Sequence, residues 1–137
     1  PKVLALCISQ ACFESAMYVF VLVWAPTMRA TIAASFGPST PTPYGTAFSV
    51  FMAACMLGST LFGYLVRQSS WLSLERVAVL VFGIASGSLI GACWLLQEPA
   101  ATDNETSAMT VVHLFSAYVM FEFCVGLYFP TMGTLRG

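Results

Sequence analysis

The chain has 137 residues, of which 58% are hydrophobic and 8% are charged, and its formal net charge at pH 7 is −1. Soluble domains carry about 25% charged residues, so this chain has too few charged side chains to cover a surface in water. It also lacks the basic clusters with which proteins bind nucleic acid. We therefore expect a lipid bilayer as its surroundings and no nucleic acid as a partner.

The cysteines all fall within apolar runs, at Cys7, Cys12, Cys55, Cys93 and Cys124. Their spacing matches neither a CxxC motif nor a Cys/His metal site. Free cysteines are commonly small apolar residues in the interior of a protein. We therefore expect no disulfide framework, no metal site and no cofactor.

Four apolar segments are long enough to cross a bilayer core of about 30 Å, which takes about 20 helical residues. They are residues 3–23, 46–66, 77–96 and 110–129. Helices satisfy their own backbone polar groups in lipid, and none of these runs alternates with period two. The expected fold class is therefore an all-α polytopic membrane protein with four transmembrane helices. Because the chain begins with Pro1 and stops at Gly137, we expect an excerpt of a longer protein.

The first span contains a polar stripe. Gln10, Glu14 and Tyr18 are four residues apart, so they share one face of a helix. A charged residue at the centre of a transmembrane helix costs about 2.5–3.5 kcal/mol on insertion scales. The stripe is therefore expected to face protein or water. We expect Pro26 to end this helix or its last turn, and the proline-rich residues 29–44 to form a surface loop.

The second and third spans carry stripes of small residues, which predict close helix packing. On the second span the stripe contains Cys55, Ser59 and Gly63, with Ala54 and Gly58 beside it. On the third span it contains Gly83, Gly87 and Gly91, again at four-residue intervals. The alternative is a sliding contact in a protein that changes conformation.

The basic residues near the span ends predict the orientation in the membrane. Lys2, Arg67, Arg76 and Arg136 fall on one side, and Arg29 falls on the other. The side with the larger number is expected to be cytoplasmic. The acidic connection at residues 97–109 is then outside. It contains the sequon Asn104-Glu105-Thr106, so Asn104 is a glycosylation candidate.

The fourth span repeats the buried acid, because Tyr118, Glu122 and Gly126 share a face. No basic residue lies inside the four spans to pair with Glu14 or Glu122. The two acids are either neutral, since desolvation disfavours a charge, or paired with groups outside this sequence. A gate, a substrate site or a proton-linked site is one interpretation of them. An interhelical hydrogen bond or ion pair that fixes packing is the other. Pro130 is expected to bend or end this helix.

Three stretches resemble a known family. FESAMYVFVLVWAP and FEFCVGLYFPTMGTLRG resemble signature stretches of the molybdate-anion transporter family of the major facilitator superfamily, and FMAACMLGSTLFGYLV is similar to its next helix. The resemblance implies that residues 1–137 are part of the C-terminal half of a transporter, helices seven to ten of twelve. The site of such a transporter lies near mid-membrane between two halves that rock about it.

The resemblance further implies secondary transport of a small oxyanion, with molybdate uptake through the cell membrane. Gln10, Glu14, Tyr18, Tyr118 and Glu122 are then the candidates for transport or coupling. An acid is a poor ligand for an anion, so Glu14 is expected to couple protons or to orient an arginine elsewhere in the protein. The alternatives are a non-transporting polytopic scaffold and a transporter of a different small solute. An enzyme is not expected, because one histidine and two mid-membrane acids offer little material for a metal site or a triad.

Overall fold

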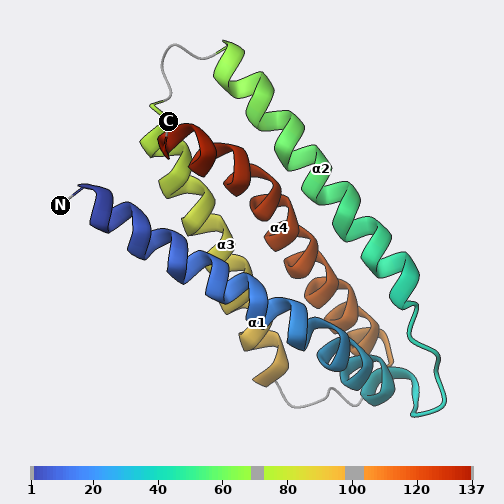
Figure 1. Cartoon of the computed structure of the whole chain (residues 1–137). Coiled ribbons are helices and arrows are strands. Elements are labelled where there is room, and N and C mark those ends of the chain that lie inside the picture. The colour runs from blue at the N-terminus through green and yellow to red at the C-terminus, as the bar shows by residue number, and fades with distance from the viewer. Residues whose placement is uncertain (1, 69–72, 98–103, 137) are drawn as a thin grey trace.

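The computed structural model describes residues 2–68, 73–97 and 104–136. These residues form four helices: α1 (Lys2–Phe36), α2 (Tyr44–Gln68), α3 (Leu74–Gln97) and α4 (Asn104–Arg136), which run up and down beside one another (Figure 1). All four are long and apolar enough to cross a membrane. The predicted all-α fold class with four transmembrane helices is therefore confirmed.

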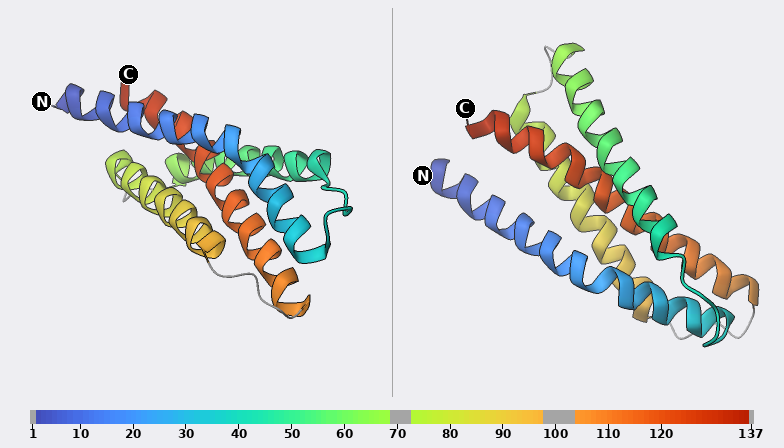
Figure 2. Two further views of the ribbon diagram at one scale, coloured as in Figure 1. Left: turned by 90° about the horizontal axis from the view of Figure 1, so that it is seen from below. Right: turned by 45° about the vertical axis from the view of Figure 1, so that its right-hand side comes forward.

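The helices extend beyond the predicted spans, and the largest difference is in α1. The prediction that Pro26 ends this helix is wrong: α1 continues through Pro26 to Phe36 and takes up half of the predicted loop at residues 29–44. A proline removes one backbone hydrogen bond, and hydroxyl side chains can compensate for such a loss in lipid. Thr27 lies next to the proline, and its Oγ1 donates to the carbonyls of Val23 at 2.7 Å and Trp24 at 3.0 Å. In the left view of Figure 2, α1 bends along its light-blue part.

The ends of α1 and α4 show where a proline does and does not stop a helix. α1 ends at Gly37, whose φ of 99° is readily adopted only by glycine and whose N–H donates to the carbonyl of Ala33 at 3.0 Å. Pro130 lies inside α4, which continues to Arg136. The glycine therefore terminates α1, and neither proline terminates its helix.

α4 is the central helix of the structure. It packs against α1, α2 and α3, whereas these three helices contact one another far less (Figures 1 and 2). Six large side chains are fully buried among the described residues, and five of them belong to α4. These five are Leu114, Phe121, Cys124, Tyr128 and Thr131. In lipid the attraction between helices comes mainly from van der Waals packing, so α4 provides most of the contact that holds these four helices together.

The closest backbone contact joins α2 to α4. A Cβ added to Gly58 would collide with the carbonyl oxygen of Phe123, and one added to Gly126 would collide with the carbonyl oxygen of Cys55. Each glycine therefore faces the backbone of the other helix. This is the close approach that small residues permit in membrane proteins.

The predicted packing stripes lie only partly at this contact. Cys55 belongs to the stripe of the second span and Gly58 lies beside it, and both meet α4. No neighbouring atom of the described chain lies within 4 Å of a Cβ built at Gly63, Gly83, Gly87 or Gly91, and Ser59 is exposed. Four-residue spacing identifies a face without showing which helix covers it. Packing of these faces against other parts of a longer protein remains a prediction.

Gly58→Ala and Gly126→Ala should each destabilise the protein, because the added methyl group meets a backbone carbonyl that can move only if the helices separate. Overpacking of this kind costs about 1–3 kcal/mol. Thermal denaturation of the detergent-solubilised protein would measure the loss. Gly63→Ala is the matched control, since its methyl group enters open space in the described chain. Equal midpoints for all three variants would mean that α2 and α4 do not approach so closely.

The ends of the helices place the basic residues as the sequence predicted. The N-terminal end of α1, the C-terminal end of α4 and the link between α2 and α3 lie at the same end of the bundle (Figure 1). Arg67 and Arg76 flank that link, and Lys2 and Arg136 lie at the adjacent helix ends. Arg29 follows the bend of α1 toward the opposite end. That the first end is cytoplasmic stays a prediction from the positive-inside rule.

Asn104 is the first residue of α4, and its side chain lies outside the part of the chain that the structure describes. The sequon also belongs to the connection at the end opposite Arg67 and Arg76. Its glycosylation therefore stays a prediction.

Cysteines introduced at Ser39 and Ser73 should react with a membrane-impermeant maleimide from opposite sides of the membrane. Ser39 lies in the link between α1 and α2, Ser73 lies directly before α3, and both are exposed. The parent should be a variant without the five native cysteines, because Cys7, Cys12 and Cys93 are also exposed. Labelling should occur outside for Ser39→Cys and inside for Ser73→Cys, in sealed vesicles of known orientation. Labelling of both from one side would contradict the four-span topology.

Candidate functional site

The acid of the first span lies between α1 and α4. Gln10 Nε2 donates a hydrogen bond of 2.8 Å to Glu14 Oε1, as the shared helix face predicted. The hydroxyl of Tyr128 on α4 donates to the same oxygen at a longer 3.3 Å. Glu14 is half-buried, and its carboxylate therefore has one partner on its own helix and one on the central helix.

Tyr18, the third member of the predicted stripe, does not join this group. Its side chain is 67% exposed. Tyr128 takes the place that the stripe suggested for Tyr18, and sequence reasoning missed it. The contact joins residues 114 positions apart, so no local spacing could have shown it.

A cluster of aromatic rings fixes α1 against α4 next to Glu14. The Phe13 ring stacks on Tyr128 with centroids 4.1 Å apart, stacks on Phe121 at 6.1 Å, and meets Phe82 of α3 edge-on at 5.2 Å. Aromatic pairs contribute about 0.5–1.5 kcal/mol each beyond the area they bury. The depth and rotation of α1 at Glu14 therefore follow from the position of the preceding Phe13.

A second set of rings continues the cluster along α1. Phe20 contacts Phe121 with ring centroids 4.8 Å apart and Tyr118 at 5.2 Å, both on α4, and Phe51 of α2 at 6.0 Å. The rings thus connect all four helices through the middle of the structure, with Phe82 providing the contact to α3.

Glu122 is the more deeply buried acid. Its side chain is 7% exposed, and within the described residues its carboxyl group makes no hydrogen bond. It lies close enough to the Cys55 thiol of α2 for an electrostatic interaction. Four residues further along α4 is Gly126, which contacts α2 directly. Glu122 therefore lies on the side of α4 that turns toward α2.

The stacked phenylalanines indicate that Glu14 and Glu122 turn to the same side of the α1–α4 pair. Each acid directly follows a phenylalanine, and these two phenylalanines stack on each other. α1 and α4 run in opposite directions (Figure 1). In two antiparallel helices that meet at equivalent residues, the next residue of each turns to the same side of the pair.

Tyr118 contacts α1, whereas Glu122 turns toward α2. Its hydroxyl lies 2.7 Å from Thr27 Oγ1 of α1, and its ring packs on Phe20. Four residues advance a helix by about 40° beyond a full turn. Along the predicted stripe, Tyr118 therefore faces α1 and Gly126 faces α2, with Glu122 between them.

Tyr118→Phe should lower the thermal stability, because it keeps the ring contact with Phe20 and removes the hydrogen bond to Thr27 beside the bend of α1. Interhelical hydrogen bonds in membrane proteins contribute about 0.6 kcal/mol on average. Tyr18→Phe is the matched control, since that exposed hydroxyl makes no hydrogen bond within the described chain. A loss of stability in the control that equals the loss in Tyr118→Phe would contradict the role of this bond.

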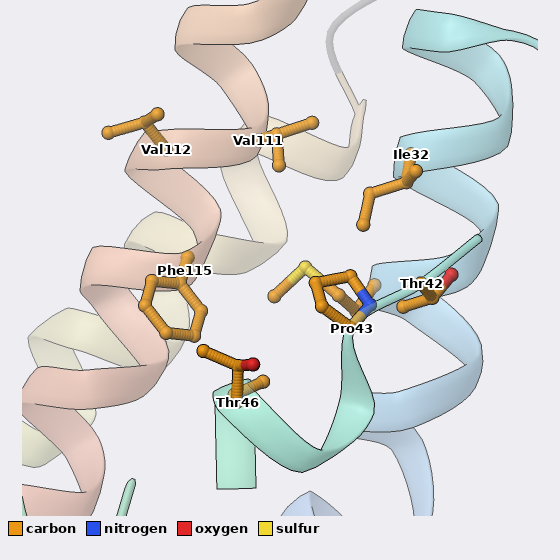
Figure 3. A pocket seen from close by; sticks show the side chains of 9 residues that line it. Ile32, Thr42, Pro43, Thr46, Val111, Val112 and Phe115 are labelled. Carbon is orange, nitrogen blue, oxygen red and sulfur yellow. The ribbon is translucent and has the colours of Figure 1, made fainter. Parts of the chain in front are cut away.

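A separate cavity lies near the end of α1 beyond its bend (Figure 3). Its volume is about 260 Å³. Ile32 of α1, Pro43 before α2, and Val111 and Phe115 of α4 border it (Figure 3). No charged side chain lines the cavity, so it offers no group that would bind an ion, and it is distinct from the site of the two acids.

The comparison with known proteins identifies the family. A family model described as sugar transporters with 12 transmembrane helices, within the major facilitator superfamily, matches residues 1–118. The chain belongs to this family. Its members are transporters and not enzymes, and their fold contains more helices than the four seen here.

The most similar curated relatives share one name. The molybdate-anion transporters of Xenopus tropicalis and Xenopus laevis are 34% and 33% identical to this chain over 135 residues, which is 98% of the chain and 26% of each relative. That of Takifugu rubripes is 29% identical over 128 residues, 93% of the chain and 23% of the relative. The chain thus spans about a quarter of the length of these relatives. No solved structure matches it significantly.

Membership in this twelve-helix transporter family bears on the side of the α1–α4 pair to which the two acids turn. Secondary transporters of this kind bind their substrates near the bilayer midplane, where two halves meet. Ionisable residues inside transmembrane helices face such cavities or protein, because lipid disfavours them. Glu14 and Glu122 meet this description by their place inside α1 and α4.

Proposed function

We propose that these helices belong to a secondary transporter that moves a small oxyanion, molybdate, across the cell membrane. The similarity to molybdate-anion transporters over 98% of the chain supports this proposal most directly. The two acids inside α1 and α4 support it further, since ionisable groups within a membrane are costly and commonly mark substrate or ion pathways.

The composition of the described spans constrains how an anion is recognised. The described arginines are Arg29, Arg67, Arg76 and Arg136, which lie toward the ends of their helices. Positive charge for a dianion near the acids must therefore come from other helices of the transporter, as basic side chains or as the N-terminal ends of broken helices. Gln10 and the hydroxyl of Tyr128 are the neutral groups that the described residues offer beside Glu14.

The acids are suited to coupling and not to ligation. A carboxylate repels an oxyanion, whereas a neutral carboxyl group does not. Proton binding at Glu14 or Glu122 would therefore make anion binding more favourable, and by linkage the anion would make proton binding more favourable. We propose protons as the coupling ion on this ground.

A sugar is the second candidate substrate, because the matching family model is described by sugar transport. Amide, carboxylate and hydroxyl groups beside stacked aromatic rings also suit a sugar, since they pair with hydroxyls while rings cover its apolar face. A non-transporting scaffold is less favoured, because it gives no reason for the acid Glu122, to which no described residue donates a hydrogen bond.

The full-length protein, reconstituted into sealed vesicles, should accumulate radiolabelled molybdate in a saturable manner when the outside is more acidic than the inside. Excess tungstate, which has the same charge and shape, should compete for the site, whereas glucose should not. Protein-free vesicles provide the background. Uptake that glucose inhibits and tungstate does not would favour the sugar. Binding of neither solute by correctly inserted protein would contradict both candidates.

A further inference from the structure

The two acids differ in what surrounds them, although both follow a phenylalanine of the same stacked pair. Glu14 Oε1 accepts hydrogen bonds from Gln10 and from Tyr128 at 2.8 and 3.3 Å. Hydrogen bonds donated to a carboxylate stabilise its charged form. Glu14 is also half-buried, so its surroundings compensate for part of the cost of its charge.

Glu122 has none of this support. Its exposed fraction is 7%, and no described residue donates a hydrogen bond to it. Among the described residues, every fully buried side-chain oxygen or nitrogen has a partner, so the carboxyl oxygens of Glu122 reach the surface of the four-helix unit. A charge without a partner in apolar surroundings is costly, and a carboxyl group can avoid the cost by binding a proton.

The ionisable groups around Glu122 do not offset its charge. On α2 the nearby group is the Cys55 thiol, and on α1 the ionisable group beside the stacked phenylalanines is Glu14. On α3 the thiol of Cys93 lies near Tyr118 and not near Glu122. None of these groups is a cation that could pair with a charge on Glu122.

We propose that Glu122 is the group that takes up and releases the coupling proton, and that Glu14, which accepts hydrogen bonds from Gln10 and Tyr128, is not. This assignment rests on the proposed function. The step is a proton transfer: a carboxylate oxygen of Glu122 gains a proton from water on one side, and the O–H bond later breaks and returns the proton to water on the other side.

The division of roles gives the direction of coupling. With Glu122 protonated, the side of the two acids carries one negative charge fewer, so an oxyanion binds more tightly there. Affinity for molybdate should therefore rise as the pH falls, and the proton should enter together with the anion. Release of the anion removes the negative charge that favoured the protonated form of Glu122. Glu122 can then lose its proton when water reaches it.

The test compares Glu122→Gln with Glu14→Gln in the full-length protein, with Glu75→Gln as the matched control. Glu75 is an exposed acid in the first turn of α3, away from the aromatic cluster. Two quantities are measured on correctly inserted protein: molybdate binding between about pH 6 and pH 8, and uptake with and without a pH gradient. Exchange of labelled for unlabelled molybdate at equal pH is recorded as well, because it requires no net proton release.

For the wild type and Glu75→Gln, affinity should rise on acidification by a factor within the range of about 5–150-fold that is common for coupled sites. Glu122→Gln should bind molybdate with the same affinity across this pH range, lose gradient-driven uptake and retain exchange. Glu14→Gln should keep the pH dependence of molybdate binding. Loss of the pH dependence in Glu14→Gln alone would overturn the assignment.

Three further outcomes are decisive. If Glu122→Gln fails to insert, the pH dependence of Glu14→Gln decides alone: its retention supports the proposal and its loss overturns it. If the wild type binds and exchanges molybdate without any effect of pH, transport stands and the role of Glu122 is overturned. Absence of molybdate binding in the wild type would instead overturn the proposed function.

Discussion

The contact of Phe13 with Phe121 and Tyr128 is the interaction on which the candidate site depends. These rings set the depth at which α1 crosses α4 and the rotation of both helices about their axes. Once the rings are stacked, Glu14 and Glu122 must lie on one side of the pair, because each follows its phenylalanine by one residue. The positions of the acids are thus a consequence of aromatic packing and not of an attraction between them.

α4 meets its neighbours by two different kinds of contact. Against α2 it packs backbone to backbone through Gly58 and Gly126, where no side chain can change rotamer to accommodate a shift. Against α1 it packs through rings and two hydrogen bonds, one between Thr27 and Tyr118 beside the bend at Pro26 and one from Tyr128 to Glu14. A movement of α1 relative to α4 needs fewer backbone clashes to be relieved than a movement of α2. The acids lie where the adjustable contact and the fixed contact meet on α4.

The parts of this structure that sequence could predict are those that depend on local spacing. Length and composition predicted four helices, and a separation of four residues predicted the contact of Gln10 with Glu14. Tyr128 could not be predicted, because its contact with Glu14 depends on how two distant helices cross. The continuation of α1 beyond Pro26 was missed because a proline inside a helix commonly ends it, whereas α1 bends and continues to Phe36.

The glycine stripes are a second case in which local spacing did not predict a contact between helices. Gly83, Gly87 and Gly91 are a more regular pattern than Gly58, yet Gly58 is the residue that meets another backbone in the described structure. Small residues permit close approach from any partner, so the pattern leaves the partner undetermined.

The two acids extend this argument to chemistry. In the sequence they are nearly equivalent, each a glutamate after a phenylalanine in a transmembrane helix. Their neighbours in space make them different: two hydrogen-bond donors reach Glu14, and none of the described residues reaches Glu122. In a low-dielectric interior such donors decide which carboxyl group can hold a charge. The identity of an acid in a membrane helix therefore indicates that a site exists, while its donors on neighbouring helices indicate which role it can take there.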